Sequence, residues 1–212
     1  GGMGPAATVD LFNKFVTFTA AQRDQEHIPL IISSIPDIPD RTVALMHNGL
    51  SPLPVMRDYM HKLEDAGAEC IVIPCNTAHY WFKELKDACH IDILSIIDTT
   101  VDEVRVCGKT RIGLLATDAT LYMGLYQKGI ESLGFNYITP DADGQKNVMK
   151  SIYSLKAGNV THAQKLMEEQ AENLFSRGAE ILILGCTEIP IILSQAVKDQ
   201  PLRYIDSTAS LV

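Results

Sequence analysis

The feature that most constrains the fold of this chain is an internal repeat. GAECIVIPC at residues 67–75 is echoed by GAEILILGC at residues 178–186, 111 residues later. Two weaker echoes have nearly the same spacing: IDTT at 97–100 with IDST at 205–208, and AT at 7–8 with AT at 119–120. Self-similarity at one spacing indicates two copies of a structural unit. For 212 residues, this repeat predicts two lobes of about 100 residues each.

Short apolar runs alternate with amphipathic segments along both halves. The runs at 30–33, 70–73, 93–96, 111–115, 181–184 and 203–205 predict strands buried on both faces. Helical periodicity appears at 5–19, 55–66 and 160–175. The alternation predicts an α/β fold of two pseudo-symmetric lobes, each a parallel sheet with helices on both faces and an active site in the cleft between them.

The repeat also predicts where the lobes divide. We expect an N-terminal lobe at 1–97, a C-terminal lobe at 98–205, and a tail at 206–212 that packs back on the first lobe. The turn-rich stretch at 34–53 is long for an ordinary connection, and such loops often carry function.

Composition excludes several classes of protein. The net charge of −8 argues against a nucleic-acid or acidic-membrane partner, and no apolar run approaches the ~18 residues of a membrane span. The five cysteines contain no C-x-x-C pair and are odd in number, which does not fit a secreted disulfide framework. We therefore expect a cytoplasmic protein.

Two of the cysteines occupy equivalent places in the repeat. Cys75 and Cys186 each follow a predicted buried strand, where ligands bind in sheets of this kind. If the lobes face each other, the two thiols meet across the cleft. A thiolate can take a proton from one face of a carbon acid while a thiol returns one to the other face. This arrangement predicts a racemase or epimerase.

Three other interpretations of the pair stay open. Buried cysteine is a common core residue, and this is our interpretation of Cys70, Cys89 and Cys107. Metal ligation by Cys75, His79 and Cys186 is a second, although structural zinc usually needs four ligands in paired short spacings. A disulfide between Cys75 and Cys186 would need an oxidising compartment.

Three segments resemble the signatures of the aspartate/glutamate racemase family: GGMGPAAT at 1–8, IPCNTAH at 73–79 and LGCTEIP at 184–190. The likeness covers essentially the whole chain and is greatest to the aspartate racemase branch. It implies a cofactor-independent amino-acid racemase, free of pyridoxal phosphate and of metal, that usually forms homodimers. It also implies that Cys75 and Cys186 are the two catalytic acid/bases and that aspartate, or glutamate, is the substrate.

The resemblance extends to substrate-binding positions. It implies that Arg41 and Lys156 meet the side-chain carboxylate of the substrate, a role that suits a guanidinium fork. The other positions that match substrate-binding residues are Met3, Asn76, Thr77, Thr117, Thr187 and Glu188. Several of these residue types more often cap helices or make turns, and that alternative stays open for each.

Some details depart from the family pattern or leave a choice. Glu188 stands where glutamate racemases typically show a histidine, which favours the aspartate branch or a relaxed aspartate/glutamate enzyme. His79 either tunes or relays the proton of Cys75 or is an ordinary core histidine. Because family members carry a strand before the glycine-rich turn, we expect residues before Gly1, and similarly a helix that continues past Val212.

Other functions remain as alternatives. A maleate-isomerase-like or hydantoin-racemase-like relative would keep both cysteines but act on a substrate without a free amino group. A non-catalytic small-acid binding protein would keep the cleft without turnover.

Overall fold

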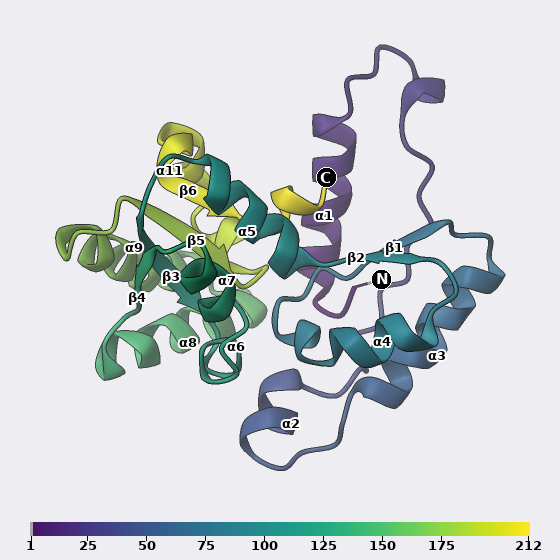
Figure 1. Cartoon of the computed structure of the whole chain (residues 1–212), viewed down its shortest axis with the longest axis horizontal. Coiled ribbons are helices and arrows are strands. Elements are labelled where there is room, and N and C mark those ends of the chain that lie inside the picture. Colours follow the sequence, from purple (N-terminus) through teal and green to yellow (C-terminus); the bar gives the residue numbers. More distant parts are fainter. Residues whose placement is uncertain (1) are drawn as a thin grey trace.

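The computed structural model describes residues 2–212, and Gly1, which opens the glycine-rich motif, lies outside them. Figure 1 shows two groups of strands and helices, one built mainly from the purple-to-blue part of the chain and the other from the green and yellow part. Strands β1 (Cys70–Val72) and β2 (Asp92–Leu94) form a two-stranded parallel sheet. A second parallel sheet has the order β4 (Asn136–Ile138), β3 (Arg111–Ala116), β5 (Ile181–Gly185), β6 (Tyr204–Asp206).

Helices connect these strands throughout. The first half of the described chain contains α1 (Pro5–Phe18), α2 (Arg41–Met46), α3 (Leu53–Asp65) and α4 (Phe82–Ala88). They are followed by α5 (Ile96–Val106), α6 (Asp118–Tyr122), α7 (Gln127–Ser132), α8 (Ala142–Lys156), α9 (Val160–Ser176), α10 (Ile189–Ile192) and α11 (Ser194–Asp199). The predicted α/β fold with parallel sheets flanked by helices is confirmed. The division into lobes at residue 97 stays a prediction.

The repeated sequence makes the same local structure twice. The glycines that open the two copies, Gly67 and Gly178, have φ of 90° and 99°, so each ends a helix in a conformation that side chains with a Cβ rarely adopt. The chain then enters β1 or β5 and reaches Cys75 or Cys186. The repeat therefore fixes where the two thiols stand relative to their strands.

The second sheet is covered on both faces because its side chains alternate. Leu115, Leu182 and Leu184 pack with residues of α8, α9 and α10. Ile112, Leu114, Ala116, Ile181 and Ile183 point the other way and pack with residues of α5 and α7. Period-2 alternation in fully apolar strands produces this two-sided core.

The first sheet is smaller than expected, because the strand predicted at 30–33 is wrong. Leu30, Ile31 and Ile32 are exposed, and the only pairing described in this region is a single parallel bridge between Gly2 and Ser34. One bridge does not make a ladder, so the segment stays extended without becoming a strand. Strand β4 was not predicted; it follows Gly134 and is short and partly exposed.

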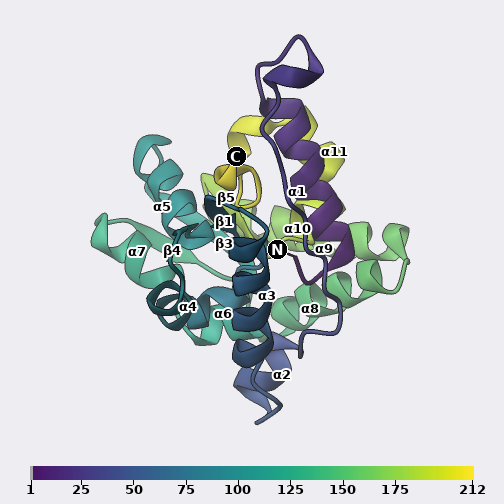
Figure 2. The same cartoon turned by 90° about the vertical axis from the view of Figure 1, so that its right-hand side faces the viewer.

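Helix α1 is tied to the second sheet by a buried cation. Lys14 Nζ lies 2.5 Å from Asp10 Oδ2 on the same helix and 2.6 Å from Asp206 Oδ2 at the end of β6. Nearby, Leu211 of the tail packs in the same core cluster as Leu11 and Ile97. The C-terminal tail therefore lies beside α1, as Figures 1 and 2 show. In residues 2–212, no helix has the length and apolar character needed to cross a bilayer.

We predict that Lys14→Ala lowers the free energy of unfolding by about 3 kcal/mol, because it leaves two poorly solvated carboxylates facing each other. Urea denaturation at pH 7 measures the change. Lys62→Ala is the matched control, because the Lys62–Asp58 pair is more than half exposed on both sides, and its loss should cost less than ~1 kcal/mol. Equal effects of the two substitutions would show that Lys14 does not join α1 to the sheet.

Candidate active site

Cys75 and Cys186 line the same cleft at the carboxyl ends of β1 and β5. The cleft contains about 490 Å³ of atom-free space, part of it open to solvent, a size that fits a small ligand. All the predicted site residues except Met3 line it: Arg41, Cys75, Asn76, Thr77, Thr117, Lys156, Cys186, Thr187 and Glu188. Two thiols from equivalent turns therefore share one space, as the repeat predicted. All five cysteines are free, so the pair is not joined as a disulfide.

Met3 lies elsewhere. Its side chain is 5% exposed and packs in the apolar core of the first lobe with Ile38 and Met56. It also lines a second hollow next to the cleft. Arg41, Lys156 and Glu188 line both spaces. The structure thus places Met3 beside the site rather than facing the two thiols, and its predicted contact with substrate stays a prediction.

An acidic group accompanies Cys186. The Cys186 thiol donates to Glu188 Oε2 at 3.0 Å, and the Thr187 hydroxyl donates to the same oxygen at 3.3 Å. Burial raises the pKa of Cys186 well above its usual value, and the charge of Glu188 adds to this effect. The ammonium of Lys156, 3.7 Å from Glu188 Oε1, acts in the opposite direction but is outweighed. Cys186 is therefore a neutral thiol at neutral pH.

A cation accompanies Cys75. Arg41 begins α2, and its Nη1 donates to the carbonyl oxygens of Ile38 and Pro39 at 3.2 and 3.1 Å. Burial alone would lower the pKa of Arg41, but its interactions with the neighbouring Cys75 and Asp40 side chains more than offset this, so the pKa is raised. Arg41 Nε is buried and has no hydrogen-bond partner among the described residues. A buried guanidinium N–H without a partner is a suitable donor for an anionic ligand.

His79 is a structural residue of the turn that carries Cys75. Its Nδ1 lies 2.9 Å from the carbonyl oxygen of Cys75, and its Nε2 accepts from the backbone N–H of Ile96 at 3.1 Å. Because Nε2 accepts, the proton is on Nδ1 and both nitrogens are engaged. The ring also stacks on Phe82, with centroids 5.3 Å apart. Both ring nitrogens are engaged by backbone groups, which favours the interpretation of His79 as a core histidine over that of a proton relay.

Buried hydroxyls join the two halves of the cleft. Thr77 Oγ1 lies 2.9 Å from both Thr117 Oγ1 and Thr120 Oγ1. Thr117 also caps α6 by accepting from the backbone N–H of Thr120. Thr77 and Thr117 both line the cleft, and their hydroxyls also hydrogen-bond to each other. Thr120 was missed as a site residue, although it belongs to the weak AT echo at 119–120.

Asn76 makes a second connection of the same kind. Its amide nitrogen donates to Ser207 Oγ at 3.1 Å, and its oxygen accepts a short hydrogen bond from Tyr126 Oη. Ser207 in turn donates to the carbonyl oxygen of Leu184 at 2.7 Å. These side chains are 0–2% exposed. Ser207 is part of the IDST echo, so sequence signals existed for Thr120 and Ser207, but none for Tyr126.

Three of the cleft-lining residues that were not chosen from the sequence carry polar side chains: Asp40, Thr42 and Tyr153. Asp40 caps α2 by accepting from the backbone N–H of Val43. The Tyr153 ring lies 5.7 Å from Lys156 Nζ, a cation–π contact that holds the ammonium near Glu188. Asp40 and Tyr153 therefore help to position Arg41 and Lys156.

Comparisons with known proteins agree with this geometry. A sequence model of Asp/Glu/Hydantoin racemases matches residues 1–212. The broad specificity amino-acid racemase RacX of Bacillus subtilis (strain 168) is 30% identical over 217 aligned positions, which cover 99% of this chain and 92% of RacX. Picrophilus torridus aspartate racemase matches with a TM-score of 0.90 and 34% identity, over 98% of this chain and 87% of that one. An aspartate racemase homologue from Pyrococcus horikoshii OT3 matches with a TM-score of 0.74 and 25% identity, over 99% and 92%.

We predict that His79 makes stability depend on pH. Burial lowers its pKa from 6.5 to about 4, so the unfolded chain binds a proton between these values and the folded chain does not. The stability that His79 contributes is therefore complete above pH 6.5 and is lost as the pH falls toward 4. At ~1.36 kcal/mol per pKa unit, this loss amounts to about 3 kcal/mol.

The measurement is urea denaturation at pH 7 and pH 5 for the wild type and for His79→Gln, which has no titrating ring. The carboxylates titrate in both proteins, so the difference between their pH slopes reports His79 alone. Identical slopes in the two proteins would contradict the prediction.

Proposed function

We propose that this chain, which belongs to the Asp/Glu/Hydantoin racemase family, interconverts L- and D-aspartate without a cofactor, using Cys75 and Cys186 as the two acid/base groups. The family implies isomerase activity; the substrate and the mechanism are our proposal. The observation that carries it is that two free thiols from equivalent turns line one cleft. Aspartate is favoured because the match to Picrophilus torridus aspartate racemase extends over 98% of the chain.

The charges around the two thiols suggest how they divide the work. In the proposal, Cys75 acts as a thiolate paired with Arg41 and removes the α-hydrogen of aspartate as a proton. Cys186, a thiol beside Glu188, donates its proton to the opposite face of the α-carbon. Cys75 is then protonated and Cys186 is a thiolate, so the enzyme in this state is set for the reverse direction. Each half-reaction needs one thiol and one thiolate, and the different neighbours of the two sulfurs favour that unequal state.

The remaining cleft residues supply contacts for a dicarboxylate. We propose that Arg41, with its unpartnered Nε, and Lys156 bind the side-chain carboxylate of aspartate. Backbone N–H groups and hydroxyls at Asn76, Thr77 and Thr187 are the candidates for the α-carboxylate. The hydroxyl oxygen of Thr117, which lines the cleft, is the candidate acceptor for the α-amino group. Negative charge that develops on the α-carboxylate during proton removal would be stabilised there.

A second candidate is a racemase of wider specificity. RacX is described as broad specificity and is 30% identical over nearly the full length of both chains. The same two thiols would act, and only the contacts to the substrate side chain would differ. A panel of L-amino acids separates the two: a preference for aspartate supports the first proposal, and comparable rates with uncharged amino acids support the second.

Each cysteine is predicted to be required for racemisation. In D₂O with L-aspartate, the wild type should produce D-aspartate with deuterium at Cα, measured by circular dichroism and mass spectrometry. Cys75→Ser and Cys186→Ser should each lower kcat by at least ~100-fold, because a serine hydroxyl is a much weaker acid than a thiol. Cys70→Ser is the control, because Cys70 is exposed and outside the cleft.

The outcomes of that experiment distinguish the alternatives. Racemisation by either cysteine variant at the wild-type rate would remove the two-base mechanism. Binding of aspartate without exchange in the wild type would indicate a binding protein, and turnover of maleate or a hydantoin alone would indicate a related isomerase.

Arg41 is predicted to recognise the side-chain carboxylate. Arg41→Lys keeps the charge but removes the planar fork, so kcat/KM for aspartate should fall at least ~10-fold more than kcat/KM for alanine. Arg57→Lys, on the exposed side of α3, is the matched control and should change neither value. Equal losses on aspartate and alanine would exclude Arg41 from recognition of the side chain.

The quaternary state is part of the proposal. We expect a homodimer in solution, which size-exclusion chromatography with light scattering measures directly.

A further inference from the structure

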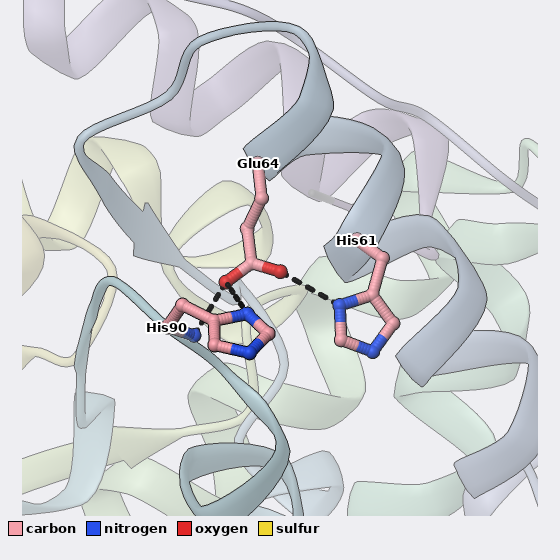
Figure 3. A group of neighbouring side chains, drawn as sticks. All are labelled: His61, Glu64 and His90. Carbon is pink, nitrogen blue, oxygen red and sulfur yellow. Dashed lines mark hydrogen bonds and ion pairs between the residues drawn. The ribbon is translucent and has the colours of Figure 1, made fainter.

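A second group of chemically reactive side chains lies in the first lobe, outside the cleft. His61 and Glu64 stand on the last two turns of α3, and His90 stands in the turn between α4 and β2 (Figure 3). His61 Nδ1 is 2.7 Å from Glu64 Oε2, and His90 Nδ1 is 3.5 Å from Glu64 Oε1. Two histidines from separate segments therefore converge on one carboxylate.

The ligand atoms are close enough to share a cation. One donor atom from each of the three residues lies within 4.8 Å of the other two. Zinc bonds of ~2.0–2.2 Å place neighbouring ligands of a tetrahedral ion roughly 3.3 Å apart, so small side-chain rotations reach that spacing. The His61 and His90 side chains are 42% and 86% exposed, which leaves space for such rotations.

The carboxylate, in contrast, is held in place. Glu64 is 11% exposed at its side chain, and its Oε1 accepts from the backbone N–H of His90 at 2.5 Å and from the Cys89 thiol at 3.2 Å. These two hydrogen bonds, with the contact from His61 Nδ1, fix the position of the carboxylate. A carboxylate oriented by neighbouring donors, with two imidazoles beside it, is an arrangement that suits a metal ion, since outer hydrogen bonds orient the ligand.

We propose that His61, Glu64 and His90 bind one divalent cation of the zinc class, with solvent completing its coordination. Two imidazoles and one carboxylate suit zinc and its neighbours in the transition series rather than magnesium or calcium, which prefer oxygen ligands. The cation would join the end of α3 to the turn that precedes β2 and so stabilise the first lobe. None of the three residues lines the cleft, so the inference does not depend on the proposed racemase activity.

Titration of the metal-stripped protein with zinc, in competition with a chromogenic chelator, tests the proposal. A phosphine keeps the free cysteines reduced during the titration. We expect one equivalent to bind and the melting temperature to rise with zinc concentration, because the ion binds the folded state. His61→Ala/His90→Ala should lower the affinity at least ~10-fold and abolish the zinc-dependent rise. His162→Ala, at a partly exposed histidine on α9, is the matched control.

Two further arms make the result decisive. Cys75→Ser/Cys186→Ser should bind zinc as the wild type does, which separates this group from the cleft thiols. His61→Asn/His90→Asn repeats the test with polar side chains, in case the alanine variant does not fold. If a folded double-histidine variant binds zinc with unchanged affinity, or if the wild type binds none, the proposal is overturned and the histidines serve only as hydrogen-bond partners of Glu64.

Discussion

The site depends on a set of buried hydrogen bonds that join the turn after β1 to the second sheet. Thr77 meets Thr117 and Thr120, and Asn76 meets Ser207 and Tyr126. In a medium of low dielectric constant, such bonds are strong when every group is satisfied and costly when one is left alone. They therefore fix the Cys75 turn at one position against β5, which leads directly into Cys186. Without them, nothing in the repeat would require the two thiols to share a cleft.

Around that fixed pair, the charges are distributed unequally. Arg41 lies beside Cys75. Cys186 instead donates a hydrogen bond to one carboxylate oxygen of Glu188, and the Lys156 ammonium lies near the other oxygen of that carboxylate. Burial of these groups makes each charge count for more than it would in water. The cleft is thus polarised along the line from one cysteine to the other. A reaction that moves a proton between two faces of a substrate benefits from such polarisation, because the donor and the acceptor must differ.

Much of this could be predicted from the sequence because the repeat carries the information. The strand, glycine and cysteine of each copy predicted β1, β5 and the cleft at their ends, and the family resemblance is confirmed by the match over residues 1–212. The strand at 30–33 was wrong because an apolar run indicates strand propensity but not a partner, and Ser34 pairs with Gly2 alone. Tyr126 was missed because a single buried tyrosine has no pattern around it. The triad of His61, Glu64 and His90 was missed because its members come together only when the turn before β2 folds against α3.

The two copies of the repeat each lead from a strand to a cysteine, but they differ in chemistry two residues after it. After Cys75 this position is Thr77, whose hydroxyl is used to join the lobes. After Cys186 it is Glu188, whose carboxylate accepts from the thiol itself. A symmetric pair of turns brings two sulfurs to one space, but identical neighbours would give them identical proton affinities. Burial raises the pKa of Cys186, and the Glu188 carboxylate, which has no counterpart in the first copy, adds to this effect. Because Glu188 accepts from the thiol, it is more than a helix-terminal charge.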